Sequence, residues 1–223
     1  MCRNLAAHFF YYMLYWTKTL KLIKFLLSDY TWDVETSAKT VYLTFDDGPI
    51  PIITPWVLQQ LKLFGAKATF FSIGKNVVEN PELLKQIVAD GHAVGNHTYN
   101  HVNGWKTSND DYLTEVRRCD EVIFANIAQD RKLFRPPYGK IKPSAARQLK
   151  KQGYEIVMWD ILSADFDQLI TPKKCLQNVL THIAPGSIIV FHDSIKAYKN
   201  LEYALPRTLK FLAEQGYNCE VLT

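Results

Sequence analysis

Two adjacent carboxylates stand out among the residues whose types suit chemistry. Asp46 and Asp47 follow an apolar run at 41–45 and precede a Gly-Pro turn. Neighbouring carboxylates raise each other's pKa, so keeping both ionised at a strand end requires cations close by. A divalent metal held by one carboxylate and an arginine beside the other would meet that requirement. The pair therefore predicts a site for metal-assisted hydrolysis.

Candidates for both cations occur further along the chain. His97 and His101 have a spacing that lets two imidazoles reach one ion, and Arg135 follows a second apolar run. Two histidines and one carboxylate make a three-ligand site with positions left for water and substrate. The histidine spacing alone is a weak signal. Its combination with the paired carboxylates favours a metal site over two ordinary surface histidines.

Short apolar runs alternate with longer segments of helical periodicity from residue 41 onward. Such alternation is typical of parallel strands joined by crossover helices. Strands are expected at 41–45, 67–73, 92–95, 132–135, 155–159, 187–191 and 218–222. Helices are expected at 54–64, 81–90, 109–127, 143–152, 172–183 and 201–215. Because no low-complexity linker interrupts the pattern, we expect one domain at 41–223, preceded by a segment at 1–40.

The positions of the polar candidates favour a barrel over a doubly wound open sheet. A (β/α) barrel gathers the C-terminal ends of its strands around one mouth, where its active site lies. An open sheet would spread the same ends along an edge. The expected fold is therefore an α/β barrel with about seven parallel strands. The residues just past the ends of different expected strands are Asp46, Asp47, His97, His101, Arg135, Asp165 and His192.

Five short motifs occur in an order that resembles one known family. They are T-F-D-D-G-P at 44–49, H-T-x-x-H at 97–101, R-P-P-Y at 135–138, an aspartate at 165 and an apolar-x-His ending at 192. This order resembles the polysaccharide deacetylases, the NodB-homology enzymes of carbohydrate esterase family 4, from residue 41 to about 222. The resemblance implies a distorted (β/α) barrel. It also implies a metal-dependent hydrolase that removes N-acetyl groups from N-acetylhexosamine units of a glycan.

Roles for individual residues follow from the resemblance. The implied metal ligands are Asp47, His97 and His101. The implied catalytic residues are Asp46 as general base, Arg135 as its partner, Tyr138 as oxyanion donor through its backbone N–H, His192 as general acid and Asp165 as the carboxylate that orients it. The expected ion is zinc, which suits two imidazoles and a carboxylate with open positions, and the same ligands would accept cobalt or nickel.

Four further residues are expected to contact substrate. Phe166 stands where the family usually has tryptophan, and Val190 stands where it usually has the leucine of the acetyl-methyl pocket. Pro137 precedes the expected oxyanion donor. Trp105 either stacks on a sugar ring at the rim or packs beneath its own loop. The two replacements leave the catalytic set intact and bear on which glycan is used.

Two other classes of function stay open. An amidase for a small molecule or an O-acetyl esterase would use the same machinery. A non-catalytic carbohydrate-binding protein would keep the fold and lose some of the catalytic residues, but all of them are present. Among glycans, peptidoglycan, a chitin-type oligomer and a lipid-linked intermediate all remain candidates.

The net charge of +4 comes from the N-terminal segment. Residues 1–28 carry Arg3, Lys18, Lys21 and Lys24 and no acid, and the remainder holds 22 basic and 22 acidic residues. A neutral folded domain argues against nucleic acid as a partner. The lysines recur at helical spacing among leucines. This pattern fits either a helix lying on an anionic membrane or a helix covering the open end of the barrel, with its lysines extended to solvent.

The aromatic and apolar run at 8–16 bears on location. It is shorter than the ~20 residues of a membrane span. It also lacks the small-residue cleavage site of a signal peptide. The expected location is cytoplasmic or peripheral at a membrane, with an N-acetylated glycan as substrate and membrane contact through 1–28.

Overall fold

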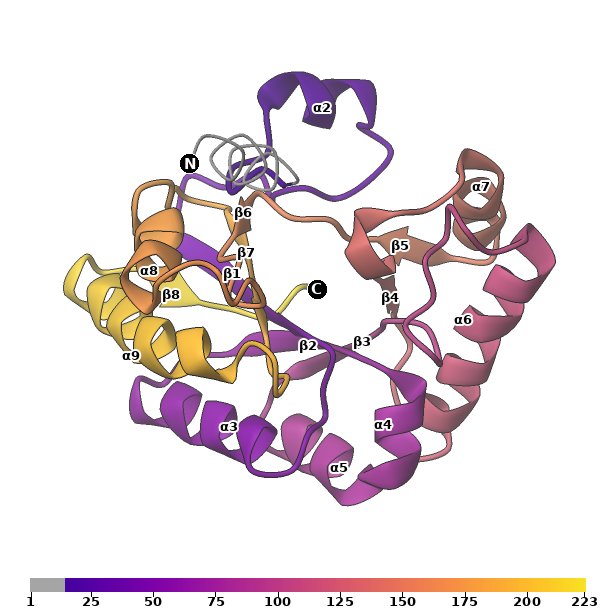
Figure 1. The fold of residues 1–223 in the computed structure, drawn as a ribbon, viewed down its shortest axis with the longest axis horizontal. Helices are drawn as coiled ribbons and strands as arrows, with labels where there is room; N and C mark the ends of the chain where they lie inside the picture. Colours follow the sequence, from indigo (N-terminus) through magenta and orange to yellow (C-terminus); the bar gives the residue numbers. More distant parts are fainter. Residues whose placement is uncertain (1–14) are drawn as a thin grey trace, which may run out of the picture.

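The protein is an α/β barrel in which one curled sheet carries the expected strands (Figure 1). The structure is a computed structural model that describes residues 15–223, so positions 8–14 of the aromatic run lie outside the described residues. Within that range the strands run in the order β5-β4-β3-β2-β1-β7-β6, β8 lies beside β1, and every pairing is parallel. The strands are β1 (Thr40–Asp46), β2 (Ala68–Ser72), β3 (Ala93–Asn96), β4 (Lys132–Phe134), β5 (Tyr154–Ile156), β6 (Ile161–Leu162), β7 (Ile188–His192) and β8 (Asn218–Cys219).

Helices surround the outside of the sheet (Figure 1). Those close to the expected positions are α3 (Ile53–Leu63), α5 (Pro81–Ala89), α6 (Asn109–Phe124), α7 (Pro143–Lys151), α8 (Pro172–Leu180) and α9 (Tyr198–Glu214). Sequence analysis missed α4 (Gly74–Glu79) and the 3-10 turn η1 (Pro137–Gly139). Both are too short to show a clear helical period.

The side chains of β1 alternate between the apolar core and the candidate site. Leu43 and Phe45 belong to the large apolar cluster that β1 shares with the surrounding helices. Thr44 and Asp46 point the other way and both contact Arg135 inside the barrel. Since side chains of a strand alternate between its two faces, this pattern puts the carboxylate of Asp46 at the mouth of the barrel.

The N-terminal segment connects the two ends of the sheet. The strand expected at 155–159 overlaps β5, whereas β6 lies beyond it and was not expected; the two lie at opposite ends of the strand order. The backbone N–H of Thr31 donates to the carbonyl of Ile156 at 2.9 Å. The N–H of Leu162 donates to the carbonyl of Thr17, also at 2.9 Å. Residues 17–31 therefore bond to both edges and help to close the barrel.

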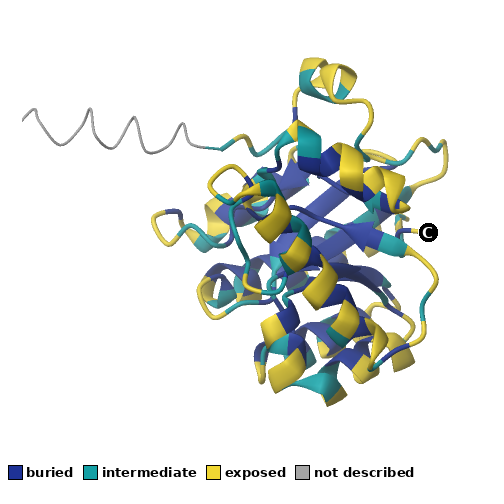
Figure 2. Ribbon diagram, turned by 90° about the vertical axis from the view of Figure 1, so that its right-hand side faces the viewer, coloured by how far each residue is buried: buried dark blue, intermediate teal, exposed yellow. Residues whose placement is uncertain are grey.

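Helix α2 (Lys21–Leu26) is oriented differently from the expected cover of the barrel. In one of the two arrangements that the sequence left open, its apolar side chains would pack on the barrel and its lysines would extend to solvent. Instead, none of its residues is buried, and the Lys24 ammonium bonds to the carboxylates of Asp160 and Asp33. Figure 2 shows buried strands and a largely exposed helix at the top of the molecule. The bond to Asp160 holds Lys24 inward, whereas Lys21 is exposed.

Candidate active site

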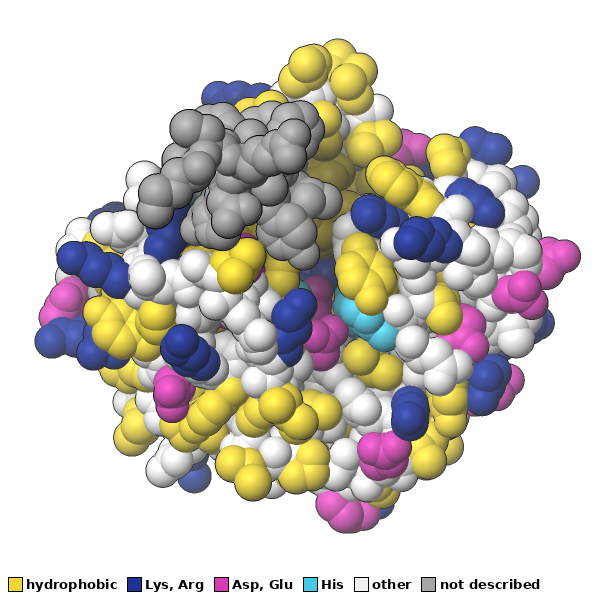
Figure 3. Space-filling model, in the orientation of Figure 1, with side chains coloured by type: hydrophobic (Ala, Val, Ile, Leu, Met, Phe, Trp, Pro, Cys, Tyr) yellow, Lys and Arg dark blue, Asp and Glu magenta, His cyan; other side chains and the backbone are white. Residues whose placement is uncertain are grey.

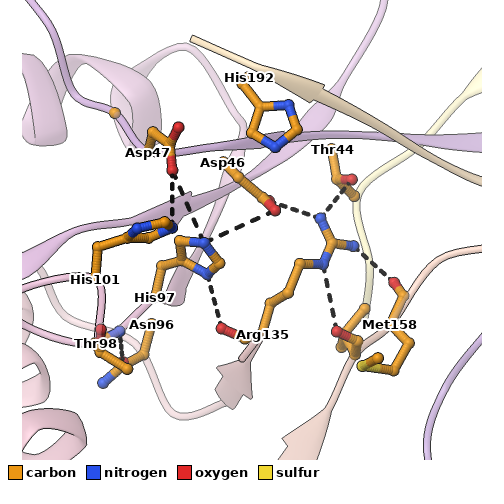
Figure 4. Close-up of polar contacts among 12 residues, drawn as sticks. Thr44, Asp46, Asp47, Asn96, His97, Thr98, His101, Arg135, Met158 and His192 are labelled. Atoms are coloured by element: carbon orange, nitrogen blue, oxygen red, sulfur yellow. Dashed lines mark hydrogen bonds and ion pairs between the residues drawn. The ribbon is translucent and has the colours of Figure 1, made fainter. Parts of the chain in front are cut away.

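Asp46 ends β1 and is bound by a buried arginine (Figure 4). The guanidinium of Arg135 donates to Oδ1 of Asp46 at 2.7 Å and to Oγ1 of Thr44 at 2.8 Å. It also donates to the carbonyl of Met158 at 2.9 Å. Burial alone would raise the pKa of Asp46, but Arg135 and two nearby histidines lower it below its usual value. The geometry therefore keeps this carboxylate ionised, as a base must be.

Two histidines lie beside the carboxylates (Figure 4). Nδ1 of His97 is 2.7 Å from the carbonyl of Arg135, which can only accept, so the proton sits on Nδ1 and leaves Nε2 as an acceptor. Nε2 of His97 lies 3.9 Å from Oδ2 of Asp46 and 3.9 Å from Oδ1 of Asp47. Burial lowers the pKa of His97 to about 4 and also lowers that of His101. Both rings are therefore neutral at neutral pH.

Asp47, His97 and His101 fit a divalent metal ion. One ligand atom from each lies within 4.8 Å of the others. Oδ1 of Asp47 is buried without a hydrogen-bond partner, and Nε2 of His101 lies 3.4 Å from it. A buried carboxylate oxygen that faces two imidazole acceptors is costly unless a cation lies among them. The ligand set expected from the sequence is thus brought together, and its chemistry suits a metal.

A second carboxylate binds His192 across the mouth of the barrel. His192 ends β7 and pairs with Asp46 in the strand register. Nδ1 of His192 lies 2.7 Å from Oδ1 of Asp165, whose Oδ2 accepts the His192 backbone N–H at 2.8 Å. Burial alone would lower the pKa of His192, but the Asp165 carboxylate raises it to about 9. The imidazolium form therefore persists at neutral pH beside an ionised Asp46.

Residues outside the predicted set hold the turn that follows β1. Asp47 has a positive φ of 84°, and Nδ2 of Asn76 donates to its carbonyl at 2.6 Å. The buried carboxylate of Asp193 accepts the N–H of Gly48 at 3.0 Å and the hydroxyl of Thr54 at 2.5 Å. The place of Asp193 directly after the expected general acid was its one sequence signal. Asn76 and Thr54 belong to no motif, so sequence analysis missed them.

A buried polar network fixes the bend that carries the histidines. Oδ1 of Asn96 accepts the N–H of Thr98 at 2.8 Å, and Nδ2 of Asn96 donates to Asp120 at 2.6 Å. The hydroxyl of Tyr154 donates to the other Asp120 oxygen. Thr98 has a φ of 63°, a conformation that a β-branched residue adopts only under constraint. These partners are far apart in sequence, which is why they gave no earlier signal.

The R-P-P-Y motif reaches His101, one of the two candidate metal-binding histidines. Tyr138 has a φ of 61°, and its ring centre lies 4.6 Å from that of His101. Pro137 is buried, whereas the Tyr138 side chain is exposed. The motif thus turns sharply next to the ligands, with one aromatic ring on the surface of the site.

The other expected substrate contacts surround the general acid or lie at the rim. The ring of Phe166 stands edge-on to that of His192, with centres 5.1 Å apart. Val190 is buried two residues earlier on the same strand. Trp105 is 61% exposed, and its Nε1 donates to the carbonyl of Ile141 at 3.3 Å. The ring is therefore not packed beneath its own loop, and its stacking on a sugar stays a prediction.

The site opens on one face of the molecule. Figure 3 shows acidic and histidine side chains together at the centre of this face, beside a hollow bordered by hydrophobic side chains. An ionised Asp46, a protonated His192 and a candidate metal-binding set therefore meet at one accessible point. Such an arrangement can activate water and protonate a leaving group.

Comparisons with known proteins agree with this geometry. A family profile described as polysaccharide deacetylase matches residues 33–157. A peptidoglycan-N-acetylglucosamine deacetylase of Bacillus cereus is 35% identical over 191 residues, which are 84% of this chain and 88% of the relative. A chitooligosaccharide deacetylase of Azorhizobium caulinodans is 33% identical over 165 residues, which are 72% of this chain and 76% of the relative. For two other relatives, the chain spans 56% and 37% of their length.

A solved structure supports the same assignment. The crystal structure of the Bc1960 peptidoglycan N-acetylglucosamine deacetylase superimposes with a TM-score of 0.83 at 30% identity, covering 89% of this chain and 94% of that one. The fold, the order of the motifs and the sequence relatives all agree. The chain therefore belongs to the polysaccharide deacetylase family, the hydrolases of carbohydrate esterase family 4 that carry the NodB homology domain.

Proposed function

We propose that this chain hydrolyses the N-acetyl amide of N-acetylhexosamine units in peptidoglycan, with zinc as its metal. The proposal rests on two groups at the mouth of the barrel that are held in opposite protonation states, the carboxylate of Asp46 and the imidazolium of His192. Arg135 keeps Asp46 ionised, and Asp165 keeps His192 protonated. Peptidoglycan is the substrate of the Bacillus cereus relative, and that likeness supports the choice of glycan.

The metal would be held by Asp47, His97 and His101. A divalent ion bound by these ligands supplies Lewis acidity, which acidifies water and polarises an acetyl carbonyl. Two neutral imidazoles and one carboxylate leave the bound ion with a net positive charge. The tautomer of His97 supports this role, because its Nδ1 bond to the Arg135 carbonyl leaves Nε2 free to ligate.

Asp46 is the general base of the proposed reaction. It takes a proton from the attacking water, and Arg135 holds the receiving carboxylate in one orientation. The backbone N–H of Tyr138, in the sharp turn beside His101, is proposed to donate to the developing oxyanion. Val190 and Phe166 would line the space for the acetyl group and the sugar next to the acid.

His192 is the general acid. An amine leaves only once it is protonated, and an imidazolium whose Nδ1 is bound by Asp165 has its Nε2 proton available for transfer. The buried Asp165 also fixes the ring through its bond to the His192 backbone. A non-catalytic binding protein would need none of these pairings, so their completeness argues for catalysis.

Acetate release from a panel of glycans tests the proposal. Peptidoglycan fragments, chitooligosaccharides and O-acetylated xylan are incubated with chelator-stripped enzyme, with zinc-reloaded enzyme, and with the variants Asp46→Asn and Asp130→Asn. Zinc-dependent release from peptidoglycan is expected, and Asp46→Asn should lower it by a factor of roughly 100 to 10,000. The exposed Asp130→Asn control should match the wild type. Release only from chitooligosaccharides, or only from the O-acetylated glycan, would overturn the proposed substrate.

A further inference from the structure

Most of the large apolar side chains at 16–27 are exposed at the surface. In α2 the Lys24 ammonium is turned toward the barrel, where it bonds to Asp160. Lys18 bonds to the same carboxylate at 2.5 Å and to the carbonyl of His182 at 3.2 Å. Of the helix itself, Lys24 thus binds the barrel and Ile23 is half-buried against the core, whereas Lys21 is exposed. The side chains left at the surface between 43% and 77% exposed are Trp16, Leu20, Leu22, Phe25, Leu26 and Leu27. We call these six residues the outward apolar face.

The outward apolar face cannot turn inward at low cost. The indole of the buried Trp32 donates to the carbonyl of Leu27 at 2.9 Å, just after the helix. The N–H of Thr19 donates to the carbonyl of Asp160 at 2.9 Å, just before it. Rotating α2 would break these bonds and also remove Lys24 from Asp160. The exposure of six large apolar side chains is therefore held in place by polar contacts. Large contiguous apolar patches on a soluble domain mark surfaces that bind something.

The charges around the face select its partner. Residues 1–28 contain no acid, and Lys21 of α2 is exposed. Helix α7 lies close to the same surface, because its Lys150 pairs at 2.8 Å with the exposed Asp29, two residues after the face ends, and offsets that acid. Arg147 and Lys151 of α7 are exposed as well. Figure 3 shows hydrophobic side chains at this edge of the molecule with Lys and Arg side chains nearby.

We propose that the outward apolar face docks the enzyme onto a membrane surface rich in anionic lipid. An apolar patch beside cations matches the boundary between acyl chains and anionic headgroups. A second copy of the chain would instead bring like charges together. Within residues 15–223 no helix is long and apolar enough to cross a bilayer, so the contact is interfacial. The run at 8–14, which precedes the face in the chain, is equally free of acids.

The position of the face relates docking to the catalytic site. In Figures 1 and 3, which share one orientation, α2 stands at the edge of the face on which the acidic and histidine side chains lie. A bilayer in contact with α2 would therefore lie beside the mouth of the barrel. The enzyme would then meet glycans that are attached to, or held close to, a membrane.

Vesicle flotation tests the proposal with the full chain. Vesicles of phosphatidylglycerol mixed with phosphatidylcholine, and vesicles of phosphatidylcholine alone, are incubated with wild type and three variants. Leu22→Ser/Phe25→Ser/Leu26→Ser removes the centre of the face. Leu63→Ser/Val78→Ser/Val88→Ser removes three exposed apolar side chains of α3, α4 and α5 as a matched control. Lys21→Glu reverses one charge at the face.

We expect the wild type to float with the anionic vesicles. The α2 triple variant should bind at least tenfold more weakly, roughly the effect of removing apolar surface from the contact. The control triple variant should bind as the wild type does. Lys21→Glu should weaken binding about fivefold, and added salt should weaken it further. Acetate release from a soluble glycan should be the same in all four proteins, which separates this test from that of the proposed function.

Three outcomes would overturn the proposal. The first is a wild type that does not float with either kind of vesicle. The second is equal flotation of the wild type and the α2 triple variant. The third is a wild type that stays free of lipid but forms dimers in sedimentation, with dimers lost in the α2 triple variant, since the face would then belong to an interface between copies.

Discussion

His192 and Asp46 occupy neighbouring register positions in opposite protonation states, and each state has its own cause. Asp46 is ionised because a buried guanidinium bonds to it. His192 is protonated because Asp165 outweighs the effect of burial. Removing one partner should therefore change one limb of the pH profile and leave the other in place. The profile of the intact enzyme should be bell-shaped.

Asp165→Asn should move the alkaline limb of kcat/KM to lower pH. A general acid works only while protonated, so activity falls as pH rises through the pKa of His192, which Asp165 raises to about 9. Without the carboxylate charge that pKa falls, by about one unit or more. The measurement is kcat/KM against pH on the glycan that releases acetate.

Asp167→Asn is the matched control, because Asp167 accepts a bond from the hydroxyl of Tyr15 at 2.6 Å rather than from the histidine. Its alkaline limb should stay where the wild type has it. If the limb were also unmoved in Asp165→Asn, a group other than His192 would be donating the proton.

The turn after β1 shows how short elements position reactive groups. Its three successive carbonyls, at Asp47, Gly48 and Pro49, accept from Asn76, from the N–H of Ile73 and from Asn80 respectively. All three donors lie on or next to α4. This helix of six residues therefore holds the metal-ligating loop from one side, while Asp193 holds it from the other.

Asn76→Ala should weaken zinc binding by about 10- to 100-fold, the usual effect of removing an outer partner of a metal ligand. The physical reason is that Asp47 would no longer be held at its positive φ. Chelator competition measures the zinc dissociation constant, and thermal melting of the metal-free protein checks that the fold survives.

Lys75→Ala is the neighbouring control, since the Lys75 side chain is exposed and only its backbone N–H bonds to the carbonyl of Tyr99. It should bind zinc as the wild type does. Unchanged zinc affinity in Asn76→Ala would mean that the backbone contacts alone set the loop.

Sequence patterns predicted the longer elements and the motif residues at the strand ends. Strand and helix periods are local, so β1, β7 and the helices of nine or more residues were found close to their observed bounds. Elements that depend on partners distant in sequence were not found. Helix α4 is too short for a period, and β6 has two residues, of which Leu162 bonds to the distant Thr17. The anchors Asn76 and Asp193 act through tertiary contacts that no single-chain motif encodes.

At the scale of the whole molecule, the barrel depends on one buried carboxylate. Asp160 accepts from Lys18, Lys24 and the hydroxyl of Ser187. It thereby ties the N-terminal segment to β6 and β7. Burial alone would raise the pKa of Asp160, but these bonds lower it below the usual value. The ionised form is therefore the one that stabilises the closed barrel.

Asp160→Asn should lower the free energy of unfolding by roughly 2 kcal/mol at neutral pH, the scale of charge-assisted hydrogen bonds. Because folding lowers the pKa of Asp160, its contribution to the free energy of unfolding is complete at pH values above its unfolded-state pKa of about 4. It is lost as pH falls below that value. Urea unfolding at several pH values should show the wild type and the variant converging in acid. The exposed Asp130→Asn serves as control, and a gap that stays constant with pH would contradict this account.

The closure of the barrel by residues 17–31 also has a consequence for how the protein is made. Lys18 and its partner Asp160 are 142 residues apart. At ribosomal speeds the segment emerges about 7 to 28 s before its partner is synthesised. During that interval its lysines have no Asp160 to bind, while its leucines and phenylalanine are already available to a nearby bilayer. The stretch translated early is thus among the last to reach its native place, and it can meet lipid before it meets the rest of its own chain.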